Sequence, residues 1–227
     1  MGWMNVLIKG EKMRIKKICF IVSIFFTAVS FLLCGHVVNT VAQEKALGKD
    51  TLSNLQEAYN RATNAKTMYL AFADIAGREG YDVPGNLFKA AAFAKEMQAQ
   101  HYGEFIIKLG RRPETSTETP VVKGTKENLE AALMSENYEH KIMYPAFMQQ
   151  AESENIREAA DVFRNTAKAA GMHVQWYSKM LDNLTFSRGL TKDFYVCPTC
   201  GNIIDAITMS RCPICATETK KFIKPAR

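Results

Sequence analysis

Residues 197–215 read CPTCGNIIDAITMSRCPIC and contain two Cys-x-x-Cys pairs separated by eleven residues. Each pair lies on a short turn that aims two thiolates at one point, and two such pairs complete a tetrahedron around a metal ion. The sequence therefore predicts a tetrathiolate site made by Cys197, Cys200, Cys212 and Cys215. Two disulfides are the alternative, which an exported chain would permit. Tetrahedral sulfur ligation suits either zinc or iron, so the spacing leaves the metal open.

Upstream of the cysteines, residues 50–183 follow a helical pattern with few interruptions. Apolar residues recur at spacings of three and four, and glycine and proline separate the segments. A polar connection, residues 111–123, lies in the middle. This arrangement predicts an all-α protein with a ferritin-like four-helix bundle. The expected helices cover residues 51–80, about 81–109, 125–154 and 156–183.

The first 42 residues have the layout of a secretory signal peptide. Three basic side chains in residues 14–17 precede an uncharged apolar run, residues 18–38, and residues 40–42 (TVA) offer small side chains for cleavage. The 21 residues of the run also suffice to span a bilayer, so a retained membrane anchor is the alternative. Either alternative predicts an exported, periplasmic or otherwise extracytoplasmic protein that contacts the membrane only through this segment.

Composition and charge exclude several classes of protein. The chain has 227 residues, of which 47% are hydrophobic and 23% charged, as in an ordinary globular protein. Its formal charge is +6, but residues 1–42 hold five basic residues and one acidic residue and so account for +4. The remaining +2 gives no basic field to attract a polyanion, so we expect no nucleic-acid partner. No glycine-rich phosphate loop is present, so a nucleotide cofactor has no support either.

Four stretches of the chain carry a family resemblance: 71–81 (AFADIAGREGY), 136–145 (ENYEHKIMYP), 158–163 (EAADVF) and 194–201 (FYVCPTCG). They resemble the rubrerythrin family, and the resemblance extends over residues 51–223. It implies a ferritin-like bundle with a diiron-carboxylate site, here residues 50–184, followed by a rubredoxin-like iron domain, here residues 192–227. Rubrerythrins are non-haem iron peroxidases that usually form antiparallel dimers, so the resemblance also implies peroxide defence and a homodimer.

The resemblance assigns the diiron ligands to seven positions, and three of them have lost a carboxylate. The family pattern is a Glu on the first helix, Glu-x-x-His on the second and fourth, and Glu-x-x-Glu on the third. The residues that retain the family's identity are His101, Glu136, Glu139 and His173. The lost carboxylates are replaced by Ala62, Gln98 and Ala170. Two iron ions with two carboxylates would leave uncompensated buried charge, so we expect no ordinary diiron peroxidase site.

The four retained residues would still converge in such a bundle. Two histidines with one or two carboxylates suit a single iron, zinc or manganese ion. The alternative is a metal-free remnant in which the carboxylates are balanced by protonated imidazoles. A buried carboxylate pair is costly without a cation, which keeps the metal alternative open.

The sequence thus predicts an exported, rubrerythrin-like metalloprotein. In this hypothesis a tetrathiolate iron site transfers electrons, with a role in peroxide and oxidative-stress defence. The alternative is a non-enzymatic structural or interaction protein with a zinc-filled cysteine module and an empty or single-metal bundle. The sequence indicates neither the catalytic residues nor the electron donor and acceptor.

Overall fold

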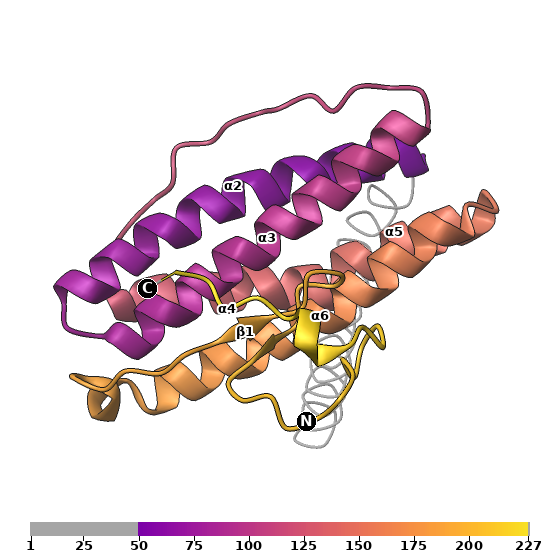
Figure 1. The fold of residues 1–227 in the computed structure, drawn as a ribbon. Coiled ribbons are helices and arrows are strands. Elements are labelled where there is room, and N and C mark those ends of the chain that lie inside the picture. Colours follow the sequence, from indigo (N-terminus) through magenta and orange to yellow (C-terminus); the bar gives the residue numbers. More distant parts are fainter. Residues whose placement is uncertain (1–49, 227) are drawn as a thin grey trace, which may run out of the picture. The chain divides into compact units, whose positions relative to one another are not determined.

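The computed structural model describes residues 50–226, and the predicted export segment lies outside them. Within this described part, no helix is both long enough and apolar enough to cross a membrane. The helices are α2 (Thr51–Arg78), α3 (Asp82–Lys108), α4 (Thr125–Tyr138), the π-helical turn η1 (Glu139–Met143), α5 (Tyr144–Ser153) and α6 (Arg157–Asp182). Because α4, η1 and α5 are continuous, they form the predicted third helix, and the ferritin-like four-helix bundle is confirmed (Figure 1).

Local sequence explains where the helices begin and end. The Asp50 carboxylate caps α2 by accepting a hydrogen bond of 2.7 Å from the Ser53 amide. Gly80 and Gly110 follow α2 and α3 with φ of +78°, a conformation that glycine adopts without steric cost. At the start of α4 the cap is Gly124, and the next amide, that of Thr125, donates to the Glu79 carboxylate.

The long connection between α3 and α4 runs along the outside of α2 (Figure 1). Three amide side chains at four-residue spacing on α2 accept hydrogen bonds from alternate backbone amides of the connection. The pairs are Gln56 with Glu114 (2.9 Å), Asn60 with Ser116 (3.0 Å) and Asn64 with Glu118 (3.0 Å). Four helical residues rise about 6 Å and two extended residues about 6.6 Å, so the two repeats match. We call these three contacts the amide ladder.

The π-helical turn has a covalent cause. Pro145 lacks the backbone N–H, and its ring collides with the carbonyl of the residue four positions earlier, here Lys141. The helix widens over Glu139–Met143, directly before this proline. The first residue of the widened turn is Glu139, one of the predicted metal ligands, and such turns are frequent at functional sites.

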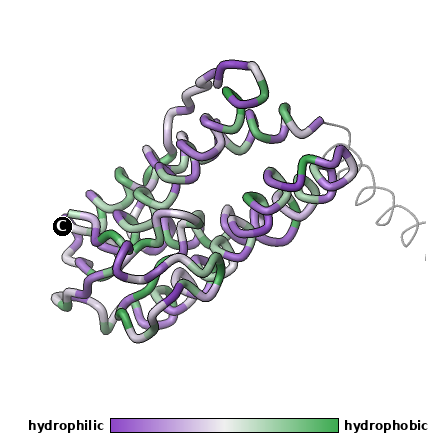
Figure 2. Tube along the Cα trace, turned by 45° about the vertical axis from the view of Figure 1, so that its right-hand side comes forward, coloured by the Kyte–Doolittle hydropathy of each residue, from purple (hydrophilic) through white to green (hydrophobic). Residues whose placement is uncertain are grey.

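The bundle core consists of two apolar clusters. Each helix carries both hydrophilic and hydrophobic residues along its length (Figure 2), as expected for helices with one buried face. The first cluster contains the fully buried rings of Tyr69, Phe72, Phe88 and Tyr177, and the second contains those of Tyr102, Tyr144, Phe147 and Phe163. Between the two clusters, α3, the third helix and α6 contribute the buried polar side chains of Lys95, Glu136, Glu139 and His173, which we call the ionic layer.

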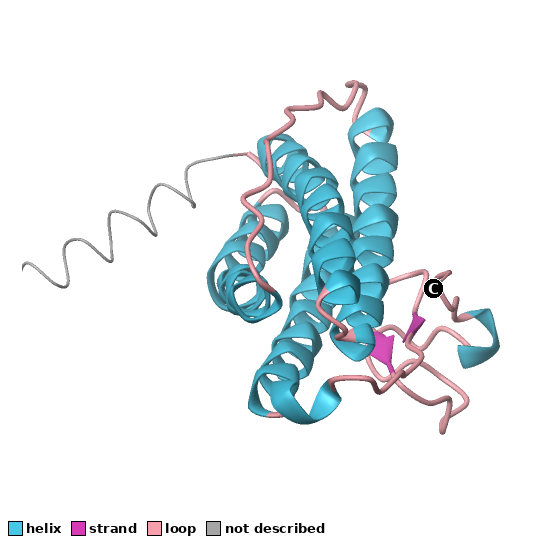
Figure 3. Ribbon diagram, turned by 90° about the vertical axis from the view of Figure 1, so that its left-hand side faces the viewer, coloured by secondary structure: helices cyan, strands magenta, loops and turns pink. Residues whose placement is uncertain are grey.

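The C-terminal module has little regular structure. Strand β1 (Tyr195–Val196) pairs antiparallel with β2 (Ile203–Ile204), and both lie beside the helices (Figure 3). Two 3₁₀ turns, η2 (Leu184–Ser187) and η3 (Thr219–Lys221), complete the described elements. The indole N–H of Trp176 on α6 donates to the Ile203 carbonyl at 2.9 Å, which fixes the module to the bundle.

Candidate functional site

The structure brings the four C-terminal cysteines together. Their sulfur atoms all lie within 4.8 Å of one another, and Cys197, Cys200 and Cys212 are buried. The distances between the two pairs are 3.5 Å from Cys197 Sγ to Cys215 Sγ and 3.6 Å from Cys200 Sγ to Cys212 Sγ. Metal–sulfur bonds of 2.3 Å in a tetrahedron place the sulfurs about 3.8 Å apart, so this donor set fits a metal ion. All four cysteines are free thiols rather than disulfides.

The two cysteine turns have the same backbone geometry. The Gly201 amide donates to the Cys197 carbonyl at 2.9 Å, and the Ala216 amide donates to the Cys212 carbonyl at 3.0 Å. Gly201 has φ of +79° and Ala216 has φ of +60°. For Ala216 this conformation is strained, and it persists because the turn has to aim both sulfurs of its pair at the centre.

The thiols influence one another's ionisation. The Cys200 thiol lowers the pKa of Cys197 to about 6 and that of Cys212 to about 5, in both cases against the opposing effect of burial. The same interactions raise the pKa of Cys200 above its usual range. Because the thiolate is the form that binds metals, Cys197 and Cys212 are prepared for ligation at neutral pH.

In the bundle, a lysine lies between the two retained carboxylates. Lys95 Nζ is 3.0 Å from Glu136 Oε1 and 2.5 Å from Glu139 Oε2, and the lysine side chain is only 1% exposed. Arg61 Nη2 approaches the other oxygen of Glu139 at 3.6 Å, and the Tyr69 hydroxyl donates to Glu136 at 3.0 Å. The pair of carboxylates is therefore neutralised by two side-chain cations.

The charges in this layer stabilise one another. Burial alone would lower the pKa of Lys95, but Glu136 and Glu139 outweigh it and raise the pKa above its usual value. Burial would raise the pKa of Glu136, but Lys95 and His173 lower it to about 2. Both groups are thus ionised across the physiological range, although neither reaches water.

The structure differs from the sequence expectation on α3. His101 is half-buried and forms no hydrogen bond or ion pair with Glu136, Glu139 or His173 among the described residues. The α3 side chain that contacts Glu136 and Glu139 is Lys95, six residues before His101. Sequence reasoning missed Lys95, although a signal exists. Phe88, Ala91, Lys95, Gln98 and Tyr102 are spaced by three or four residues, and all five are buried.

The three replaced positions are all buried. Ala62 and Ala170 are 1% exposed and offer no ligand atom, and Gln98 is 3% exposed. The Gln98 amide points to the cysteine module, where its Nε2 lies 3.4 Å from the Cys200 carbonyl oxygen. None of these three side chains contributes a negative charge to the ionic layer.

His173 connects the ionic layer with the cysteine module. Its Nδ1 is 3.3 Å from Glu136 Oε1, and its Nε2 is 2.8 Å from the Gly201 carbonyl oxygen. A carbonyl only accepts, so Nε2 carries the proton and donates it to Gly201. The ring thus joins the buried carboxylate to the residue that follows Cys200.

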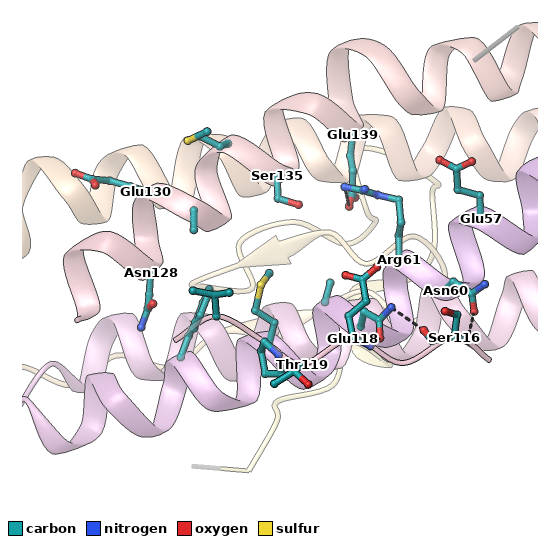
Figure 4. A pocket seen from close by; sticks show the side chains of 18 of the residues that line it. Glu57, Asn60, Arg61, Ser116, Glu118, Thr119, Asn128, Glu130, Ser135 and Glu139 are labelled. Atoms are coloured by element: carbon teal, nitrogen blue, oxygen red, sulfur yellow. Dashed lines mark hydrogen bonds and ion pairs between the residues drawn. The ribbon is translucent and has the colours of Figure 1, made fainter. Parts of the chain in front are cut away.

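A groove of about 970 Å³ leads toward the ionic layer from outside (Figure 4). It is lined by α2, α4 and residues 116–123 of the connection, and its lining includes Arg61 and Glu139. Figure 4 shows the Arg61 side chain between Glu118 and Glu139. The groove therefore reaches Glu139 from the Arg61 side, whereas Lys95 is not part of its lining.

Comparison with known proteins points to one family. The family model described as Rubrerythrin matches residues 53–181. The chain is 31% identical to a putative rubrerythrin of Methanocaldococcus jannaschii, over 77% of this chain and 92% of that protein. It is 32% identical to a rubrerythrin of Porphyromonas gingivalis, over 74% of this chain and 86% of that protein. The solved structure of fully reduced, all-ferrous nigerythrin superposes with a TM-score of 0.72 at 29% identity, covering 78% of this chain and 87% of that one.

Proposed function

The chain belongs to the rubrerythrin family, and we propose that it is an exported iron protein of oxidative-stress defence whose cysteine module transfers electrons. The observation that carries the proposal is the convergence of Cys197, Cys200, Cys212 and Cys215 within 4.8 Å. Iron held by four thiolates supplies one-electron transfer through its ferrous and ferric states, and because sulfur occupies every coordination position, no position is left for peroxide.

The position of the cysteine module supports an electron-transfer role. Cys215 is partly exposed, whereas the other three cysteines are buried. Residues 207, 209 and 223 of the module are exposed apolar side chains. An electron can therefore enter or leave through Cys215, and the exposed apolar side chains of the same module suit a brief protein contact.

We also propose that this chain lacks the diiron site of its relatives. Ala62 and Ala170 offer no donor atom, and Gln98 is neutral and occupied at the cysteine module. Peroxide reduction at a bundle iron pair would then be absent. Turnover of hydrogen peroxide by the chain should stay at the level of free iron, whereas a diiron relative measured in parallel should exceed it.

Metal content and the visible spectrum test the electron-transfer proposal. The chain is purified without a metal-affinity tag from iron-supplied cells, and we expect about one iron per chain with the red colour of ferric tetrathiolate. Cys200→Ser and Cys212→Ser should lose iron and colour. Ser210→Ala, an exposed residue between the two cysteine pairs, is the matched control and should keep both. A colourless protein with one zinc per chain, after anaerobic purification and oxidation, would refute the redox role and favour a structural module.

Export and assembly are separate parts of the proposal. The three basic residues Arg14, Lys16 and Lys17, followed by the apolar run 18–38, support export, by cleavage or as an anchor. Fractionation of the source cells, with mass determination of the mature chain, distinguishes the two. We also propose a homodimer, and light scattering coupled to gel filtration measures the mass of the assembly. A monomeric mass at micromolar concentration contradicts the dimer.

A further inference from the structure

The central position of the bundle is occupied by a side-chain cation. Lys95 Nζ bridges Glu136 Oε1 and Glu139 Oε2 at 3.0 and 2.5 Å, and both carboxylates are at most 2% exposed. The two glutamates come from successive turns of the third helix, so one ammonium between them satisfies both. A metal bound to both carboxylates would occupy the position between them. Here a side-chain ammonium of α3 occupies that position instead.

The two carboxylates of the layer already have two side-chain cations beside them. Glu136 and Glu139 carry two negative charges, and Lys95 and Arg61 carry two positive charges within 3.6 Å of them. Two divalent ions would add four positive charges to a region shielded from water. Without further carboxylates, this charge would be uncompensated and costly. The layer therefore has no electrostatic demand for a metal.

The position of the Lys95 ammonium also opposes a metal between the two carboxylates. Zinc binds carboxylate oxygen at about 2.0–2.2 Å, and an ion so close to Glu136 Oε1 and Glu139 Oε2 would compete for the space of the Lys95 ammonium. Both ring nitrogens of His173 already face partners, Glu136 and the Gly201 carbonyl. Among the described residues, the four cysteines are the one group of three or more ligand side chains close enough to share an ion.

We propose that the Lys95 ammonium takes the place of the bundle metal ions, so that the chain binds a metal only at its four cysteines. The bundle is then a charge-paired support for the cysteine module, and His173 and Gln98 contact that module. This inference does not depend on which metal the cysteines hold. Zinc at the cysteines would refute the redox function but leave the role of Lys95 intact.

The test combines metal counting with thermal unfolding of the full chain. We expect wild type to bind one metal per chain, and added Fe²⁺, supplied anaerobically, to leave the melting temperature unchanged once that site is filled. Lys95→Glu removes the cation and adds a third buried carboxylate. We expect this variant to melt lower than wild type without added metal, and to bind additional Fe²⁺ with a rise in melting temperature. Lys89→Glu makes the same charge change at a half-buried position on α3 and should keep one metal per chain.

A second variant covers the case in which Lys95→Glu does not fold. Lys95→Met keeps the length of the side chain and leaves Glu136 and Glu139 without their bridging cation. Its melting temperature should fall by roughly 10 °C, as expected for breaking a buried ion pair. Lys95→Met/Glu139→Gln should recover part of that loss. Wild type with any metal ion bound beyond the cysteine site, or Lys95→Met as stable as wild type, would overturn the inference.

Discussion

The Nε2 atom of His173 lies 2.8 Å from the carbonyl oxygen of Gly201, and its Nδ1 atom lies 3.3 Å from the Glu136 carboxylate. One buried ring thus contacts the ionic layer of the bundle and the turn that carries Cys200. The position of the cysteine module on the bundle therefore depends in part on α6, and variants on either side of this contact test that dependence.

Gly201→Ala is expected to loosen the cysteine module. A Cβ atom at this position would lie 2.6 Å from Gln98 Nε2 and 3.3 Å from Ala94 Cβ, in addition to the strain of a φ of +79°. Gly110 has φ of +78° and open space around the same position, so Gly110→Ala measures the backbone strain alone, about 1–2 kcal/mol. Urea unfolding should give a larger loss for Gly201→Ala, and Gln98→Ala should relieve part of it. Equal losses at both glycines would show that the contact with Gln98 has no effect.

Glu136 should make the protein sensitive to acid. Its pKa falls from 4.5 to about 2 on folding, because Lys95 and His173 outweigh burial. A depressed carboxyl pKa stabilises the fold above the unfolded-state pKa, and this contribution is lost as the pH falls from 4.5 toward 2. Unfolding free energies measured across this range should decline more steeply for wild type than for Glu136→Gln. Glu130→Gln, at an exposed position on α4, should keep the wild-type slope.

Asn60→Ala is expected to release the α3–α4 connection. The variant removes the middle contact of the amide ladder, which joins Asn60 Oδ1 to the Ser116 amide at 3.0 Å. The contact is exposed, so the global stability should change by only about 0.5–1 kcal/mol. Hydrogen exchange at residues 114–118 should accelerate much more than exchange in the helices. Thr67→Ala, on an exposed part of α2 outside the ladder, should leave that exchange unchanged.

Removal of the metal should unfold the cysteine module but leave the bundle intact. The module has two strands of two residues each and a small apolar cluster around Cys197, Cys200, Cys212 and Phe222. So small a core needs a metal to stay folded. After chelation, exchange protection should be lost at residues 195–223, and the helical circular dichroism signal should persist. Loss of both together would show that the bundle depends on the module.

Much of the architecture was predictable from the sequence. The helical periodicity, the breaks at Gly80 and Gly110 and the long central connection determine a four-helix bundle, and the spacing of the cysteines determines their convergence. The Pro145 ring widens the third helix. Hydrophobic periodicity does not reveal this change of the backbone, because it predicts one continuous helix. The bundle bounds and the export segment stay predictions.

The ionic layer was only partly predictable. Glu136 and Glu139 were expected at the centre, and their spacing of three residues places both near one point. Lys95 was not expected, because a lysine next to Glu96 is typical of a solvated face. Only the buried neighbours at positions 88, 91, 98 and 102 distinguish it, and burial depends on tertiary packing. The structure gives His101 no contact with these carboxylates among the described residues, and the choice between adjacent helical turns depends on the partner helices.

The ionic layer also has a consequence for folding. It lies between two aromatic clusters, so a helix displaced along its axis by one turn would carry a charged side chain among phenyl rings and leave an opposing charge unpaired. Each such misaligned bundle would bury an uncompensated ion, whose cost far exceeds that of a shifted apolar contact. The single lysine therefore favours the native alignment of α3 over alignments displaced by one turn.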